Sequence, residues 1–193
     1  MKVLLIDHED SFVYNLYQAL RVLGADVECL RCTEPVRRSI RSDPDAIVLS
    51  PGPGHPQDQQ VTGHSRALLT RWRKERPFLG VCLGHQLLAE FYGGRVDRAE
   101  SPVHGETVEM MHLAVPLFRK VPRTFVGARY HSLVVQRAGL PRDLLVTAFT
   151  RQGTIMALDH RSDPVHGVQF HPESYLTAVG PQILQNFLAE TRR

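Results

Sequence analysis

The segment GVCLGHQLLAEFYGG, Gly80–Gly94, decides the fold, because it places a cysteine between two glycines where an apolar run becomes a helical pattern. Phe78–Val81 reads as a buried strand, and a helix follows Cys82. Glycine weakens the interior of a strand or a helix, so the two flanking glycines indicate a sharp reversal between these elements. The segment therefore predicts a strand, a tight turn and a helix, the unit of a parallel sheet.

Strands and helices alternate in the same way before this segment. The expected strands are Lys2–Asp7, Asp26–Arg31 and Ala46–Ser50. In the helix after the first strand, Asp10 is the expected N-cap and Gly24 the expected end. The next expected helix, Gly63–Lys74, places three apolar residues on one face: Ala67, Leu68 and Trp72. The alternation is typical of a parallel sheet with helices on both faces.

The pattern changes after the helix that follows Cys82. Six strand-like segments with short turns follow: RVDRA, ETVEMM, FVGARYHSLVV, LLVTAFT, TIMALDH and VHGVQF. A final helix, GPQILQNFLAETRR, carries an apolar stripe. The fold predicted is a single α/β domain, residues 1–193, with a largely parallel central sheet flanked by helices and an antiparallel extension in the C-terminal half.

Composition narrows the classes of function. The chain has 193 residues, of which 42% are hydrophobic, enough for one sizeable core. The net charge of +3 comes without the basic stripe and interleaved aromatic residues of nucleic-acid binders, so we expect no nucleic-acid partner. The densest basic cluster, Pro35–Arg41, is interpreted as a solvated face in preference to a polyanion site. No apolar stretch approaches membrane-spanning length, so we expect no membrane partner either.

The cysteines indicate a reduced environment. Their number, three, is odd and no targeting segment is recognised, which predicts a cytoplasmic location. Cys29 and Cys32 form a C-x-x-C pair, but a zinc site needs a second pair of ligands, and a redox motif normally opens a helix. We interpret both as ordinary packing residues and expect no metal.

Cys82 has the surroundings of a nucleophile. G-x-C-x-G after a strand and before a helix has the pattern of a nucleophile elbow, with sulfur in place of oxygen. The unpaired N–H groups and the dipole at a helix N-terminus favour a thiolate, and the N–H of Leu83 is free to face a developing oxyanion. The alternative is a buried packing cysteine.

A thiolate nucleophile needs a base, and His171 is the strongest candidate among ten histidines. It follows the expected strand VHGVQF and begins the tripeptide H-P-E, in which Pro172 stiffens the turn. Glu173 can then accept the hydrogen of the far imidazole nitrogen, which would supply base and orienting group together. The alternative is a surface histidine in a turn.

Two further segments are candidates for contact with a substrate. Ser50–Gly54 reads SPGPG after a strand, so it is either a loop with accessible backbone N–H groups or merely a rigid turn. Arg129–Leu133 carries polar residues that strand alternation does not demand. It either contacts a substrate or is a core strand with a hydrogen-bonded His131.

Several motifs, taken together, resemble those of the class I (triad) glutamine amidotransferases: GVCLGHQ, SPGPG, RYHSL and GVQFHPES. DHEDSFVYNL near the start and VHGE at Val103–Glu106 look like the glutaminase subunits of anthranilate synthase and aminodeoxychorismate synthase. The resemblance covers nearly the whole chain. It implies the fold described above and an enzyme that takes ammonia from glutamine.

The resemblance also implies roles for individual residues. Cys82 would be the nucleophile, His171 the acid and base, and Glu173 the orienting group. The N–H groups of Gly54 and Leu83 would form the oxyanion hole. The implied glutamine-binding residues are Gly52, Pro53, Gly54, Gln86, Ser132 and Leu133.

The resemblance further implies a substrate and a partner. The substrate is L-glutamine, no cofactor is needed, and ammonia passes to a chorismate-utilising synthase subunit. The alternatives are a stand-alone γ-glutamyl hydrolase and a non-catalytic regulatory subunit. The sequence departs from the family at Glu106, where lysine is usual, at His8-Glu9, where Asn-Tyr is usual, and in HPQDQQVTG. In the family these segments lie near the partner, so the departures bear on which partner is used.

Overall fold

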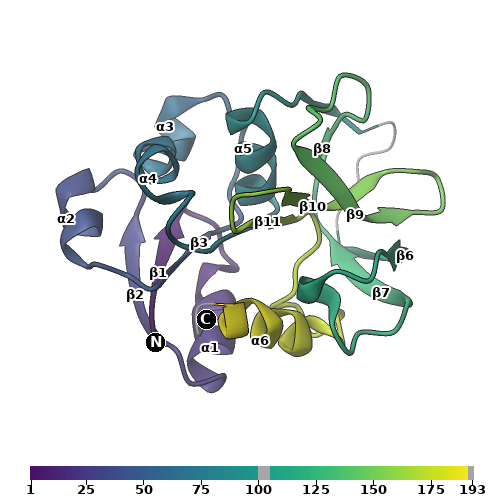
Figure 1. The fold of residues 1–193 in the computed structure, drawn as a ribbon, viewed down its shortest axis with the longest axis horizontal. Coiled ribbons are helices and arrows are strands. Elements are labelled where there is room, and N and C mark those ends of the chain that lie inside the picture. Colours follow the sequence, from purple (N-terminus) through teal and green to yellow (C-terminus); the bar gives the residue numbers. More distant parts are fainter. Residues whose placement is uncertain (100–104, 191–193) are drawn as a thin grey trace.

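A nine-stranded sheet forms the centre of the computed structural model, which describes residues 1–99 and 105–190 (Figure 1). The strand order is β2-β1-β3-β4-β11-β10-β9-β6-β7. Its strands are β1 (Lys2–Asp7), β2 (Asp26–Arg31), β3 (Ala46–Leu49), β4 (Phe78–Val81), β6 (Glu106–His112), β7 (Thr124–Arg129), β9 (Leu144–Thr150), β10 (Ile155–His160) and β11 (Val165–Val168). A separate pair joins β5 (Val96–Arg98) and β8 (Leu133–Val135).

The sheet has a parallel half and an antiparallel half. Strands β2, β1, β3, β4 and β11 pair in parallel, and β10, β9, β6 and β7 continue the sheet in antiparallel pairs. Within the parallel half, β3, β4 and β11 are buried along their whole length, as expected for strands covered on both faces. The predicted fold class is confirmed.

Helices cover both faces of the parallel half. They are α1 (Val13–Val22), α2 (Val36–Arg41), α3 (Gln59–Thr62), α4 (Ser65–Trp72), α5 (Leu83–Phe91) and α6 (Gly180–Glu190), with a 3₁₀ turn at Pro116–Phe118. Successive residues of β1 enter different cores: Leu5 packs in the cluster that contains residues of α1 and α6, and Leu4 packs with residues of α4 and α5. Figure 1 shows α1 and α6 on one side of the sheet and α4 and α5 on the other. No helix of the described residues is both long enough and apolar enough to cross a bilayer.

The structure corrects two local predictions for the helices. Helix α1 begins at Val13, and its N-cap is Phe12. The Asp10 carboxylate accepts a hydrogen bond from the N–H of Phe12 at 2.8 Å, before the first residue of the helix, so Asp10 is not the N-cap. In α4, Ala67 is exposed and Leu69 is buried in its place, because the face of the helix that packs inward is rotated from the expected one. The expected end of α1 is confirmed, since Gly24 adopts a φ of 86° there.

The basic cluster and the C-x-x-C pair have structural roles. The cluster Pro35–Arg41 contains α2, which was not predicted, and its arginines lie on the solvent side. Cys29 and Cys32 are free thiols. Cys32 is buried and its Sγ donates to the Val61 carbonyl at 3.3 Å, whereas Cys29 packs against the other core cluster. Their interpretation as packing residues is confirmed.

A buried charged histidine joins α6 to the sheet. His166 of β11 contacts Asp159 Oδ1 through Nδ1 at 2.9 Å and Glu190 Oε2 through Nε2 at 2.7 Å. Burial acts to lower the pKa of His166, but the hydrogen bonds and charges of the two carboxylates outweigh it and raise the pKa to about 10. At neutral pH this imidazolium therefore holds the end of α6 on β10 and β11.

The stabilisation by His166 depends on pH in a defined direction. Because the pKa is raised on folding, the contribution is complete below the unfolded value of about 6.5 and is lost as pH rises towards about 10. We expect His166→Gln to lower the free energy of unfolding by about 3 kcal/mol in mildly acidic buffer. Urea denaturation across the pH range should show this difference narrowing at alkaline pH. A difference that stays constant with pH would contradict the account.

Candidate active site

Cys82 occupies a strained turn between β4 and α5. Its φ of 52° and ψ of −101° lie where a residue with a side chain is disfavoured. The glycines on either side make the turn possible. A Cβ on Gly84 would lie 2.3 Å from the Leu49 carbonyl oxygen, and one on Gly80 would lie 2.5 Å from the backbone of Gly84. The N-terminus of α5 is thus pressed against β3 and β4, and the elbow expected from the sequence is present.

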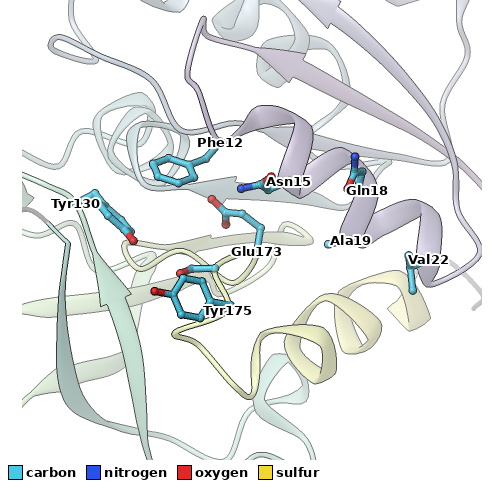
Figure 2. A pocket seen from close by; sticks show the side chains of 9 residues that line it. Phe12, Asn15, Gln18, Ala19, Val22, Tyr130, Glu173 and Tyr175 are labelled. Atoms are coloured by element: carbon cyan, nitrogen blue, oxygen red, sulfur yellow. The ribbon is translucent and has the colours of Figure 1, made fainter.

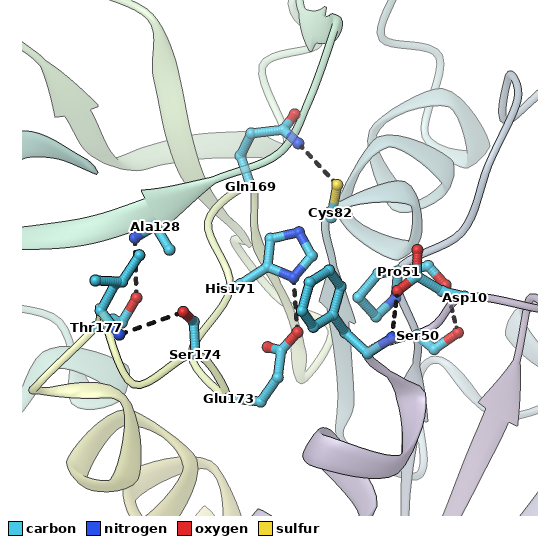
Figure 3. A network of polar contacts seen from close by, with 12 residues as sticks. Asp10, Ser50, Pro51, Cys82, Ala128, Gln169, His171, Glu173, Ser174 and Thr177 are labelled. Carbon is cyan, nitrogen blue, oxygen red and sulfur yellow. Dashed lines mark hydrogen bonds and ion pairs between the residues drawn. The ribbon is translucent and has the colours of Figure 1, made fainter. Parts of the chain in front are cut away.

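His171 is held beside Cys82 by a fully buried carboxylate. Its Nδ1 lies 2.6 Å from Glu173 Oε1, and its Nε2 lies on the Cys82 side of the ring (Figure 3). The backbone N–H of His171 donates to the Ala128 carbonyl at 3.1 Å, which fixes the turn against β7. The structure therefore brings together the three residues expected to form a triad, one at the start of α5 and two in the turn after β11.

The electrostatics of His171 keep its imidazole protonated. Burial alone would lower the pKa of His171, but the hydrogen bond and charge of Glu173, together with the neighbouring Cys82 sulfur, outweigh burial and raise the pKa to about 10. The imidazolium therefore persists at neutral pH beside the Cys82 sulfur. Such a pair presents both a nucleophile and a proton donor to the same substrate.

Two aromatic rings, those of Phe12 and Tyr130, fix the plane of the imidazole, and Phe12 was not among the predicted site residues. Phe12 meets His171 edge-on at 5.7 Å between ring centroids, and Tyr130 does so at 5.0 Å. The same two rings contact each other at 5.0 Å. Phe12 lies just before α1, which places its ring beside the turn that carries His171. Edge-on packing restricts rotation of the ring that Glu173 orients.

Gln169 is a further site residue that sequence reasoning missed. It is fully buried, and its Nε2 lies 3.6 Å from Cys82 Sγ. The Oε1 of Gln169 accepts a hydrogen bond from Gln86 Nε2 at 3.1 Å. Gln86 Nε2 also donates to the Leu133 carbonyl at 3.0 Å. The one signal in the sequence was a polar residue within the apolar run VHGVQF. Gln86 and Leu133, two of the expected glutamine-binding residues, therefore lie close together.

The Ser50–Gly54 loop lies against the N-terminus of α5. A Cβ on Gly52 would lie 2.5 Å from a side-chain carbon of Leu83, so the loop leaves no room for a side chain there. Pro53 and Gly54 are exposed, and Gly54 has a φ of 78°. As the first residue of α5, Leu83 has an N–H with no acceptor within the helix.

His8 supports this loop from the interior. His8 is only 2% exposed. Its Nδ1 lies 3.1 Å from the Ser50 carbonyl oxygen and its Nε2 lies 2.9 Å from Ser65 Oγ. Burial is the main cause that lowers the pKa of His8 to about 4, so the ring is neutral. This buried neutral ring links the end of β3 to α4, whereas the neighbouring Glu9 is exposed.

The remaining expected segments are placed as follows. The run FVGARYHSLVV is not one strand, because β7 ends at Arg129 and β8 begins at Leu133 in the other sheet. His131 is buried in the connection between them, where burial is the largest of the effects that lower its pKa to about 4, and Ser132 is exposed. Glu106 is exposed at the start of β6, whereas residues 103 and 104 of the VHGE motif lie outside the described residues.

A cavity of about 380 Å³ opens next to Glu173, between α1 and the turn after β11 (Figure 2). Phe12, Tyr130 and Tyr175 are among the residues around it. Neither Cys82 nor the Ser50–Gly54 loop lines it, so we do not assign glutamine to this cavity. Within the described part of the chain, no group of three or more potential ligands is arranged to hold a metal ion.

The sequence matches known proteins over almost its whole length. The family model described as glutamine amidotransferase class-I matches residues 4–191. The chain belongs to the class I glutamine amidotransferases. It is 46% identical over 193 residues to anthranilate synthase component 2 of Methanothermobacter thermautotrophicus, covering 96% of this chain and 97% of that one. It is 40% identical over 192 residues to aminodeoxychorismate/anthranilate synthase component 2 of Bacillus subtilis, covering 99% and 97%.

This class I glutamine amidotransferase also shares its fold with a solved structure. The crystal structure of a glutamine amidotransferase from Thermotoga maritima superposes with a TM-score of 0.78 at 18% identity, covering 99% of this chain and 97% of that one. At that identity the likeness concerns the fold alone. The resemblance inferred from the sequence motifs is confirmed at the level of the family.

In this amidotransferase, the close approach of Gly84 to the backbone of Leu49 can be tested directly. We expect Gly84→Ala to lower the free energy of unfolding by about 3 kcal/mol or more, because the added methyl group meets backbone atoms of Leu49 that cannot move independently. Gly153→Ala is the matched control: its φ is 88° and nothing lies within 4 Å, so only about 1–2 kcal/mol of backbone strain is expected. Equal losses in urea denaturation would contradict the argument.

Proposed function

We propose that this chain hydrolyses L-glutamine to glutamate and ammonia, and delivers the ammonia to a chorismate-aminating synthase subunit. The observation that carries the proposal is a buried imidazole held between Glu173 and a strained cysteine at a helix N-terminus. The named relatives support the choice of partner, since both are component 2 of synthases. Membership of the class I glutamine amidotransferases supports glutamine as the substrate.

The mechanism follows from the positions of the triad. The Cys82 thiolate attacks the carboxamide carbon of glutamine and forms a tetrahedral intermediate. His171 gives its Nε2 proton to the departing nitrogen, so ammonia leaves and a γ-glutamyl thioester remains on Cys82. His171, now neutral, takes a proton from the water that attacks the thioester. Glutamate is released, and the thiolate and the imidazolium are restored. Glu173 stabilises the imidazolium in both steps.

The substrate is proposed to lie between the Ser50–Gly54 loop and α5. The N–H groups of Gly54 and Leu83 would stabilise the oxyanion, since the first is on an exposed loop and the second begins a helix. Gly52 and Pro53 would contact glutamine through their backbone.

Gln86, Ser132 and Leu133 would hold the rest of the substrate. Both hydrogens of Gln86 Nε2 are used within the protein, so its Oε1 is the group left to accept a hydrogen bond from glutamine. The backbone of Ser132 and Leu133 would hold the amino-acid end. The short distance from Gln86 to the Leu133 carbonyl supports a shared contact surface for these residues.

We propose a cytoplasmic location, because the three cysteines are free, as is usual in a reducing compartment. The two competing functions would make different demands on the site. A stand-alone γ-glutamyl hydrolase would need no synthase, and a regulatory subunit would need no nucleophile. The buried imidazolium beside Cys82 favours catalysis over a regulatory role, because such a role does not require the strained turn. The component 2 relatives favour a synthase partner over a stand-alone hydrolase.

Glutamate release by the purified chain, with and without a chorismate-aminating subunit from the same genome, tests the proposal. We expect the partner to stimulate release, and Cys82→Ser to reduce it by about 10³-fold or more, because a hydroxyl is a far weaker nucleophile at neutral pH. Cys29→Ser is the matched control and should remain active, since Cys29 only packs against a core cluster. Release that Cys82→Ser leaves unchanged would remove Cys82 from the mechanism. Release that the partner never stimulates would favour the stand-alone hydrolase.

A further inference from the structure

Two buried glutamines link the sulfur of Cys82 to the start of β8. Gln86 Nε2 donates to the Leu133 carbonyl at 3.0 Å and to Gln169 Oε1 at 3.1 Å. Gln169 Nε2 lies 3.6 Å from Cys82 Sγ, within hydrogen-bonding range for sulfur. Gln86 is 3% exposed and Gln169 is fully buried, so bulk water does not compete for these groups. We call the chain from the Leu133 carbonyl through both amides to the sulfur the amide relay.

The relay determines which way the Gln169 amide faces. A side-chain amide has one end that donates and one that accepts. The Leu133 carbonyl can only accept, so Gln86 must present Nε2 to it, and the same nitrogen then donates to Gln169. The oxygen of Gln169 is thereby engaged, and its NH₂ end is turned towards Cys82. With the opposite orientation an oxygen would face the thiolate and repel it.

The backbone holds Gln169 in register with the nucleophile. The N–H of Cys82 donates to the carbonyl of Val168, the residue before Gln169, at 2.8 Å. The N–H of Gln169 donates to the Met156 carbonyl of β10 at 2.9 Å. Gln169 and His171 approach Cys82 from different directions (Figure 3). The sulfur therefore has an amide donor that is independent of the imidazole.

We infer that Gln169 is a catalytic residue whose amide donates to the Cys82 thiolate, and that Gln86 is the positioning residue that keeps this amide in its donating orientation. The inference rests on the proposed function in one respect, namely that Cys82 reacts as a thiolate. The Gln169 amide is a donor that remains in place after His171 has given its proton to ammonia. The amide also stabilises the thiolate as it leaves the tetrahedral intermediate that water forms from the thioester.

The relay also connects the sulfur to the segment proposed to hold the substrate. Leu133 supplies the acceptor at one end, and Cys82 lies at the other. A shift of the Leu133 carbonyl when glutamine binds would change the hydrogen bond of Gln86, and through it the orientation of Gln169. The reactivity of the thiolate is thus tied to the geometry of the segment around Leu133.

The pH dependence of Cys82 alkylation by iodoacetamide, read from the Cys82 peptide by mass spectrometry, tests the relay without any use of glutamine. The full chain is compared with Gln169→Met, which keeps a similar volume but removes the donor. We expect the alkylation midpoint to move up by about one pH unit, the effect of one hydrogen bond to a charged group. Gln86→Met should move it in the same direction, and the double variant should move it no further than Gln169→Met alone.

A matched control separates the relay from a general effect of losing a buried amide. Asn186 is a buried amide that donates to the Leu117 and Arg119 carbonyls beside α6, and it belongs to neither the relay nor the triad. Asn186→Leu should leave the pH profile of Cys82 alkylation unchanged.

If Gln169→Met does not fold, Gln169→Glu keeps the shape of the side chain and replaces the donor by a carboxylate. The midpoint of Cys82 alkylation should then rise by more than about one pH unit.

The outcomes distinguish this inference from the proposed function. An unshifted profile in a folded Gln169 variant would overturn the relay, and so would shifts from Gln86→Met and Gln169→Met that simply add. Glutamate release is measured on the same samples. Release by the unmodified chain together with unshifted profiles would overturn the relay alone. Shifted profiles in a chain that releases no glutamate, with or without the synthase, would overturn the proposed function and leave the relay standing.

Discussion

The site depends on one steric constraint, the contact of the N-terminus of α5 with the ends of β3 and β4. Gly80 and Gly84 allow this contact, because neither position has room for a Cβ. The chain must then reverse within a single residue, and that residue, Cys82, takes a positive φ. The packing of α5 offsets the strain, since Leu87 and Leu88 join the core on that face of the sheet. The sheet therefore positions the sulfur before any catalytic partner does.

Two buried histidines show how the choice of partners separates a structural site from a reactive one. His166 contacts two carboxylates, so its charge is compensated on both sides and it holds α6 in place. His171 contacts one carboxylate, and its second ring nitrogen lies on the side of Cys82. Both carry a raised pKa for similar electrostatic reasons. Of the two, only His171 has an Nε2 that lies beside a thiol and not a second carboxylate, which suits the proton transfer proposed for it.

The sequence predicted the parts of the molecule that local rules control, and missed those that depend on distant contacts. Apolar runs such as Phe78–Val81 indicate buried strands, and glycines at fixed offsets indicate the elbow at Cys82. Gln169 was missed because its partners lie 83 and 87 positions away in the chain. The support that His8 gives to the Ser50–Gly54 loop was missed for the same reason, since the two serines that hold it are 42 and 57 positions away. No local pattern encodes such hydrogen bonds.

The central claim is that Cys82, and no other thiol, attacks glutamine. Burial raises the pKa of both Cys29 and Cys32 to about 11, so neither is a competing thiolate at neutral pH. The most direct measurement is mass spectrometry of the chain quenched in acid during turnover of glutamine. The account predicts a γ-glutamyl adduct on the peptide that contains Cys82, absent from Cys82→Ser. Glutamate formation with no adduct on Cys82, or with an adduct on another residue, would contradict it.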